Sequence, residues 1–253
     1  MKFGMGQPVK RKEDVRFLTG KGRYTDDINL DGQAIGYVFR SPMPAAKIRS
    51  LDVSAAKAAP GVLDVYTYAD LEADGVQPLP CGVPLKNIDG SDRYDSKRHA
   101  LARDRVRYVG DPIAFVVAET LAQARDAAEL IEVDLEELPH CTDPARAVEP
   151  GAPRVWDDCE QNTCFTWERG KKEETEAAFA KAEHVVPFRI VNNRIVVNSM
   201  EPRACIGDFE ADSERLVLHV CSQGTHNLRR LMAQGVFGVP PEQMHITTPD
   251  VGG

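Results

Sequence analysis

The sequence has no long apolar run and no excess of positive charge. No stretch approaches the ~20 consecutive apolar residues that a membrane-spanning helix needs, and the first residues lead into charged side chains, unlike a signal peptide. The formal net charge of −8 argues against a nucleic-acid-binding surface, which requires concentrated Lys and Arg. The composition therefore predicts an ordinary globular protein rather than a membrane or nucleic-acid-binding one.

A cysteine framework is also missing. The six cysteines stand at positions 81, 141, 159, 164, 205 and 221, without the spacing of a disulfide scaffold. Cys159 and Cys164 with His184 do not match a zinc site, and neither Cys205 nor Cys221 has iron–sulfur spacing. We therefore expect reduced thiols, a cytoplasmic location and no metal bound directly by side chains.

Acidic residues are scarce at one place, the N-terminal arm. The first 23 residues carry seven Lys or Arg against Glu13 and Asp14. Such an arm either binds an acidic partner or is a solvated tail, and the pattern favours the tail.

The hydrophobic pattern predicts two strand–helix–strand units in residues 20–147. The first has strands at 47–53 and 62–67 around a short helix, after an initial strand at 34–39. The second has strands at 113–118 and 131–135 around a helix that Thr120 caps, with Leu121, Ala124, Ala127 and Ala128 on its apolar face. Residues 75–99, rich in turn formers, predict a long loop. We expect a compact α/β or α+β domain.

A second region follows a linker at residues 148–170. The pattern predicts a helix at 172–181 with Ala177, Ala178 and Phe179 on its inner face, and a second helix at 224–235. Strands are expected at 183–190, 195–197, 203–209, 216–220 and 243–247.

Two glycine-containing turns follow predicted strands of this region. One is Cys221-Ser-Gln-Gly-Thr-His226, and the other is Thr248-Pro-Asp-Val-Gly-Gly253. Glycine lets a backbone turn sharply or approach a ligand closely. No strand is followed by a Gly-x-Gly-x-x-Gly turn, so a nucleotide-binding protein is poorly supported.

These two turns resemble the opening of the molybdenum-cofactor domain in the xanthine oxidase family of molybdenum hydroxylases. Met200-Glu-Pro-Arg203 resembles the same family. Upstream, an ordered set of short motifs resembles the a/b hammerhead domain of the aldehyde oxidase, xanthine dehydrogenase and carbon monoxide dehydrogenase large subunits. The set is Tyr24-Thr-Asp-Asp27, Arg40-Ser-Pro42, Pro60-Gly-Val62, Val106-Arg-Tyr-Val-Gly-Asp-Pro112 and Val117-Ala-Glu-Thr120.

The resemblance predicts an arm at residues 1–19, a hammerhead domain at 20–147, a linker at 148–170 and the first part of a molybdenum-cofactor-binding domain at 171–253. It implies hydroxylation of an aldehyde or heteroaromatic carbon, or oxidation of carbon monoxide, with water as the oxygen source. The cofactor would be molybdopterin with molybdenum, and the resemblance leaves open whether it is the cytosine dinucleotide form. Electrons would pass to a 2Fe-2S subunit and a FAD subunit.

The resemblance also assigns site residues. Gln223 would donate a hydrogen bond to an oxo-type ligand of molybdenum or to substrate, which suits an amide because it donates without charge. Gly224 would allow close approach of the backbone, while Gly252 and Gly253 would begin the loop that packs against the metal.

Other interpretations of these residues stay open. The Gln223 amide would otherwise cap a turn, and the two final glycines would form a simple tight turn. His226 is expected to be a buried or capping histidine rather than a cofactor contact. Glu201 and Arg203 are expected to form a salt bridge rather than to bind a ligand.

The family's Phe-Gly continuation and its late glutamate base have no counterpart among these residues. The resemblance thus predicts part of a larger catalytic subunit, completed by the remainder of the molybdenum-binding subunit and inert by itself, since a base must reach the reacting group. The alternative is a non-catalytic split or truncated subunit, an assembly module for a complementary catalytic chain.

Overall fold

The computed structural model describes residue 6 and residues 8–252. The chain divides into two compact units. The central unit comprises residues 34–196 and 235–238, and the terminal unit comprises residues 1–33, 197–234 and 239–253. Among the described residues, no helix has both the length and the apolar character to cross a bilayer. The domain limits expected from the sequence stay a prediction.

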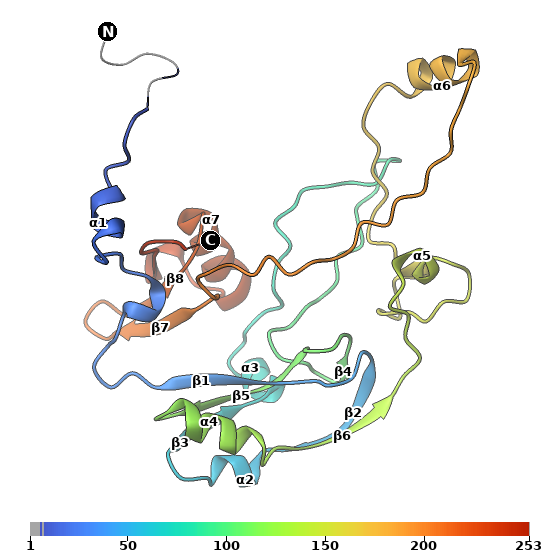
Figure 1. Ribbon diagram of the computed structural model, residues 1–253. Helices are drawn as coiled ribbons and strands as arrows, with labels where there is room; N and C mark the ends of the chain where they lie inside the picture. Colours follow the sequence, from blue (N-terminus) through green and yellow to red (C-terminus); the bar gives the residue numbers. More distant parts are fainter. Residues whose placement is uncertain (1–5, 7, 253) are drawn as a thin grey trace. The chain divides into compact units, whose positions relative to one another are not determined.

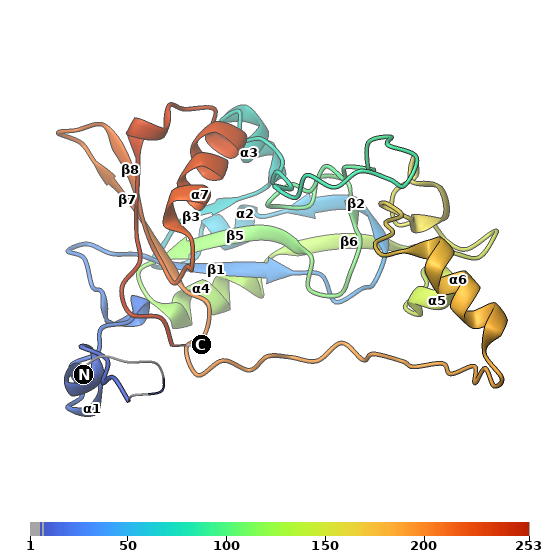
Figure 2. The same cartoon turned by 90° about the horizontal axis from the view of Figure 1, so that it is seen from above.

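The central unit is built on two antiparallel three-stranded sheets (Figures 1 and 2). Their strand orders are β1-β5-β3 and β4-β2-β6. The strands are β1 (Ile35–Arg40), β2 (Ala46–Asp52), β3 (Val62–Tyr66), β4 (Arg105–Val106), β5 (Pro112–Ala118) and β6 (Glu132–Glu137). This antiparallel pairing makes the unit α+β.

The predicted strand–helix–strand units exist, but each one joins the two sheets. α2 (Ser54–Lys57) leads from β2 in one sheet to β3 in the other, and α4 (Leu121–Ala128) leads from β5 to β6. A parallel sheet would have kept both strands of each unit together. The sequence pattern predicted the elements correctly and left their pairing undetermined.

Helix α4 covers the first sheet. Thr120 caps it as expected, because its Oγ1 accepts the N–H of Gln123 at 3.3 Å. The alanines at 124, 127 and 128 are buried and α4 contacts β1 and β5, whereas Leu121, expected on the same face, is 43% exposed. Small side chains let the helix approach the strands closely, and the core there is completed by buried residues such as Val65 and Val116.

The remaining elements of the central unit are short. After α3 (Tyr68–Ala73), residues 75–99 form the expected loop, which only isolated bridges interrupt. α5 (Pro144–Ala147) and a 3-10 turn (Glu160–Asn162) follow, and then α6 (Lys172–Lys181).

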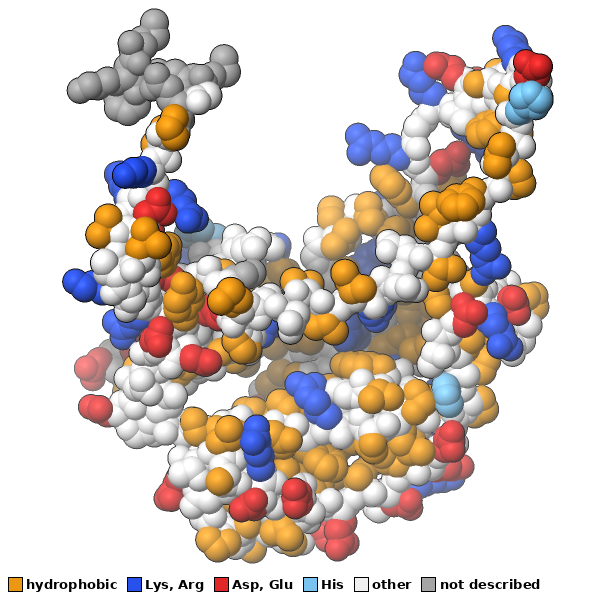
Figure 3. Space-filling view, viewed as in Figure 1, with side chains coloured by type: hydrophobic (Ala, Val, Ile, Leu, Met, Phe, Trp, Pro, Cys, Tyr) orange, Lys and Arg blue, Asp and Glu red, His pale blue; other side chains and the backbone are white. Residues whose placement is uncertain are grey.

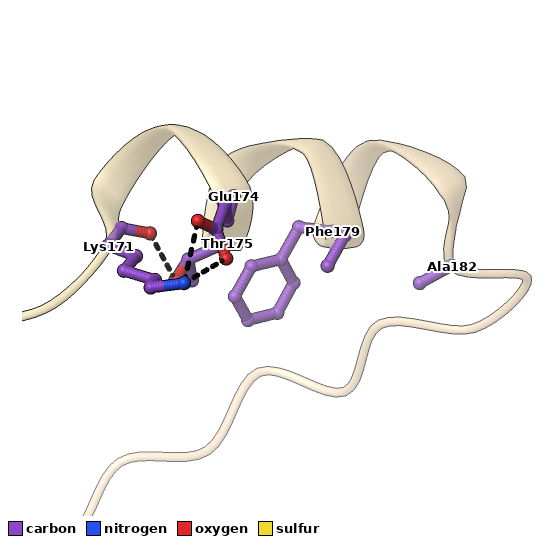
Figure 4. Close-up of a pocket in the computed structure, with 6 residues that line it drawn as sticks. Lys171, Glu174, Thr175, Phe179 and Ala182 are labelled. Atoms are coloured by element: carbon purple, nitrogen blue, oxygen red, sulfur yellow. Dashed lines mark hydrogen bonds and ion pairs between the residues drawn. The ribbon is translucent and has the colours of Figure 1, made fainter.

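The expected inner face of α6 is wrong. Ala177, Ala178 and Phe179 are all exposed, and 59% of the Phe179 surface is accessible to solvent. Figure 4 shows Phe179 beside a polar turn in which the Lys171 ammonium pairs with Glu174 at 2.9 Å. The helix is held by such local contacts and buries none of its residues.

The strands expected at 183–190 and 195–197 are also wrong. Residues 184–199 form no strand and pair with no other strand among the described residues. Their apolar side chains are exposed, including Phe188 at 84% and Val196 at 85%, and hydrophobic side chains are visible along this part of Figure 3. Alternating apolar residues favour a sheet, but a strand forms only where another backbone supplies the hydrogen bonds.

The terminal unit contains the third sheet, with strand order β7-β8-β9. β7 (Cys205–Glu210) and β8 (Arg215–Val220) form an antiparallel hairpin, and β9 (Met244–Thr247) pairs with β8 in parallel. α7 (Thr225–Arg230) and a π-helical stretch (Leu231–Phe237) connect β8 to β9, after which a 3-10 turn (Pro241–Gln243) leads into β9. The N-terminal part adds α1 (Asp14–Leu18) and a 3-10 turn (Thr25–Asp27).

We predict that Ile113→Ala destabilises the central unit. Ile113 lies in β5 with no exposed surface and packs with Ala46 and Val106, so truncation lowers the free energy of unfolding by about 2–5 kcal/mol. Urea denaturation followed by tryptophan fluorescence measures this, because both tryptophans belong to the central unit.

Ile88→Ala is the matched control. Ile88 is 62% exposed in the long loop, so the same truncation there changes stability by no more than about 0.5 kcal/mol. Equal unfolding midpoints for the two variants would contradict the assigned core.

Candidate functional site

The two glycine turns follow neighbouring parallel strands. β8 and β9 are in register from Leu216 opposite Met244 to His219 opposite Thr247. The carboxyl ends of both strands therefore meet at one edge of the sheet, where the Thr248 hydroxyl donates to the Val220 carbonyl at 3.0 Å. Ligand sites in sheets with parallel strands lie at this edge. The structure thus brings the segments that contain Gln223 and Gly252 to one end of the terminal unit.

The Gln223 side chain makes no hydrogen bond to any described residue. It is exposed, and none of the side-chain hydrogen bonds of the described residues involves it. The turn is closed instead by Ser222, whose Oγ accepts the Gly224 N–H at 3.1 Å. The alternative in which the Gln223 amide caps the turn is therefore not observed, and both N–H groups of the amide are available to a ligand.

Gly224 and Gly252 are glycines for different physical reasons. Gly224 has an extended φ of −159°, and a Cβ built there would meet no atom within 4 Å. A Cβ on Gly252 would lie 2.7 Å from the Cβ of Glu201 and 3.2 Å from the Tyr24 ring. The protein itself requires glycine at 252, while at 224 the space is open.

Glu201 contacts the second glycine turn directly. Its Oε2 accepts the Gly252 N–H at 2.6 Å, and its Oε1 accepts the Thr25 N–H at 3.4 Å. The Glu201 N–H also donates to the Gly252 carbonyl at 3.4 Å. The expected salt bridge between Glu201 and Arg203 is wrong, because backbone N–H groups supplied by distant parts of the sequence hold the carboxylate.

Asp250 fixes the other end of this turn to the N-terminal arm. The Arg16 guanidinium approaches its two carboxylate oxygens at 2.5 and 2.6 Å, a bidentate pair. The Arg23 N–H donates to the same carboxylate at 2.8 Å, and the Asp250 N–H donates to the Arg23 carbonyl at 2.9 Å. Arg16 is therefore not part of a freely solvated tail, since it binds an acidic residue of its own chain.

The other candidates lie as follows. His226 is exposed rather than buried. Gly253 lies outside the described residues. The described residues contain no group of three or more His, Cys, Asp or Glu that could hold a metal ion. Sequence reasoning missed the role of Glu201 and did not single out Asp250 or Arg16, and the only signal for the first two was their position inside motifs already quoted.

We predict that the Asp250 carboxyl has a pKa below its ordinary value of 3.8. The Arg23 N–H is the largest cause and Arg16 the next, and both stabilise the charged form. A lowered pKa in the folded state means that the contribution to stability is present above about pH 3.8 and is lost as the pH falls through the lower value. Carbon-13 NMR titration measures the midpoint directly.

Arg16→Ala should raise this midpoint towards 3.8 without reaching it, because the Arg23 N–H remains. Arg11→Ala is the control, since Arg11 pairs with Asp14 at 3.0 Å and not with Asp250. A wild-type midpoint at or above 3.8, or equal shifts in both variants, would contradict the assignment.

Two family models match consecutive parts of the chain. The a/b hammerhead domain of aldehyde oxidase and xanthine dehydrogenase matches residues 19–139, and the molybdopterin cofactor-binding domain matches residues 155–253. The second match includes both glycine turns.

Similar proteins match nearly the whole chain. The carbon monoxide dehydrogenase large chain of Afipia carboxidovorans is 36% identical over 99% of this chain and 31% of its own length. The nicotine 6-hydroxylase large subunit of Paenarthrobacter nicotinovorans is 35% identical over 98% of this chain and 29% of its own length. The chain thus spans under a third of these relatives.

Solved structures agree with this similarity. Quinoline 2-oxidoreductase from Pseudomonas putida 86 superposes with a TM-score of 0.85 at 32% identity, over 100% of this chain and 31% of the other. Carbon monoxide dehydrogenase in its carbon monoxide-reduced state gives 0.83 at 35% identity, over 99% and 31%. With two consecutive domain models, related sequences and related structures in agreement, the chain belongs to the xanthine oxidase family of molybdenum hydroxylases, as an N-terminal portion of the large, molybdopterin-binding subunit.

Proposed function

We propose that this chain forms part of the molybdenum-cofactor site of an oxidoreductase that hydroxylates an aldehyde or heteroaromatic carbon, or oxidises carbon monoxide. The observation that carries the proposal is the parallel pairing of β8 with β9, which gathers the two glycine turns at one sheet edge. Relatives described as carbon monoxide dehydrogenase, nicotine 6-hydroxylase and aldehyde oxidoreductase support this reaction class.

The residues at this edge fit an uncharged ligand-holding role. Gln223 offers an exposed amide with no partner among the described residues, and the space beside Gly224 is open. Gln223 would donate a hydrogen bond to the cofactor or to bound substrate, and Gly224 would let the backbone approach closely. Gly252 and Gly253 would form the wall of the cofactor site on the side of β9. When bound, the molybdenum cofactor supplies the two-electron oxidation chemistry.

We propose that the complete subunit works with an iron–sulfur subunit and a FAD subunit, that water supplies the oxygen, and that the pterin carries a cytosine nucleotide. The family's division of labour motivates these assignments. Molybdenum, iron, FAD and nucleotide analysis of the purified complex tests each one separately.

The described carboxyl groups whose pKa is shifted are poorly suited to act as a general base. A base works best with a pKa near the working pH. The carboxyls whose pKa departs from the usual value are all shifted downward, each by hydrogen bonds that favour the charged form. They are Asp52, Asp64, Asp70, Asp89 and Asp250.

We therefore predict that residues 1–253 alone are inactive. Chain supplied with molybdenum cofactor should turn over no aldehyde, N-heteroaromatic compound or carbon monoxide, as followed by reduction of an artificial dye. The complete subunit purified with its partners is the positive control. Turnover by the isolated chain would contradict the prediction.

We further predict that Gln223→Ala in the complete subunit lowers kcat by about 10–100-fold, the usual effect of losing a ligand-orienting hydrogen bond. Gln223→Glu should be as damaging, because it keeps the shape but replaces the N–H donors with negative charge. Steady-state kinetics and molybdenum content are measured together, and the metal content should remain close to wild type.

Gln243→Ala is the matched control, because Gln243 is exposed in the turn before β9 and lies outside the proposed site. Its kcat should match wild type. A wild-type kcat in Gln223→Ala would remove the assigned role.

A further inference from the structure

The carboxylate of Glu201 is placed to hold backbone rather than a cation. None of the ion pairs formed by the described residues includes it. Its two oxygens face the N–H groups of Gly252 and Thr25 instead. Hydrogen bonds to an ionised carboxylate are short and about twice as strong as neutral ones. The 2.6 Å contact with Gly252 belongs to this class.

Close packing allows this contact. Gly252 lies between Glu201 and the Tyr24 ring, and the distances to its absent Cβ leave no room for any other residue. The Glu201 N–H returns a bond to the Gly252 carbonyl. The peptide groups on both sides of the Gly252 Cα are thus tied to one residue, which fixes the orientation of the turn.

The arm secures the same turn two residues earlier. Asp250 is bound by Arg16 and by the backbone of Arg23, and its side chain is only 11% exposed to solvent. Thr25, which shares the Glu201 carboxylate, begins the 3-10 turn that follows the arm and is fully buried. Residues from near position 16, near position 25, position 201 and positions 250–252 therefore converge on one short segment of the terminal unit.

We propose that Glu201 is a positioning residue, which holds the Gly252 backbone in place so that the turn after β9 forms a fixed wall of the cofactor site. This rests on the proposed function for the identity of the ligand, whereas the hold on Gly252 stands independently. Glu201 acts through the backbone of the turn and does not touch substrate.

Hydrogen exchange of the Gly252 amide tests the hold directly in the 253-residue chain. Glu201→Ala should accelerate exchange at Gly252 by about tenfold or more, because a bond to a charged acceptor is lost. Glu201→Gln keeps an oxygen acceptor without the charge and should fall between Glu201→Ala and wild type. Exchange at Val217, in the buried part of β8, reports whether the unit remains folded.

Glu210→Ala is the matched control. Glu210 is an exposed carboxylate at the end of β7 that accepts from the Ser213 hydroxyl at 2.8 Å. Its loss should leave Gly252 exchange at the wild-type rate. If Glu201→Ala also loses protection at Val217, Glu201→Gln decides. Wild-type exchange at Gly252 in every folded Glu201 variant would overturn the proposal.

Kinetics of the complete subunit with its partners test the consequence. Glu201→Ala should lower kcat by about 10–100-fold with little change in KM or molybdenum content, because a displaced wall misaligns the reacting groups. Glu201→Gln should restore part of the loss, which a merely structural role would not require. A wild-type kcat despite faster Gly252 exchange would overturn the positioning role. Absence of molybdenum from the wild-type complex would refute the proposed function and leave the exchange result standing.

Discussion

The parallel pairing of β8 with β9 is the constraint on which the candidate site depends. Parallel neighbours need a long crossover, here α7 and the π-helical stretch, and they place their carboxyl ends at one edge. The crossover is anchored by packing of Ala233, Met244 and Ile246 in the core of the terminal unit. A shift of one residue in the register of β9 would turn Met244 and Ile246 to the other face of the sheet, so the same core that stabilises the unit also positions the candidate site.

Local features of the fold could be predicted from the sequence because their causes are local. Thr120 caps α4 through a residue three positions away, and the apolar run in β5 is buried as its composition indicates. The pairing of the strands has no such local cause. In the central unit, α2 and α4 each connect a strand of one sheet to a strand of the other sheet. The spacing of the elements in the sequence did not indicate this connection.

The wrong predictions have one physical origin. The apolar alternation of residues 183–199 and the apolar side of α6 describe surfaces suited to burial, but burial requires a partner surface. Glu201 shows the same limit for charge, since its neighbour Arg203 is near in sequence while its actual partners lie 51 and 176 positions away. The sequence motif indicated that this segment matters, and only the structure shows what it holds.

The two described glycines of the site show how similar sequence signals differ physically. Gly252 must be glycine because Glu201 and Tyr24 occupy the space that a side chain would need. Packing within the protein therefore explains this glycine. Gly224 has neither a left-handed backbone nor a close neighbour in the described chain, so the protein itself gives no reason for it. No contact within the described chain requires a glycine at position 224, and the neighbouring Gln223 amide has no hydrogen-bond partner there. Both features favour a ligand at this position. In the proposed site, Gly252, held by Glu201, would form part of the wall, and Gln223 with Gly224 would form the surface that a cofactor meets.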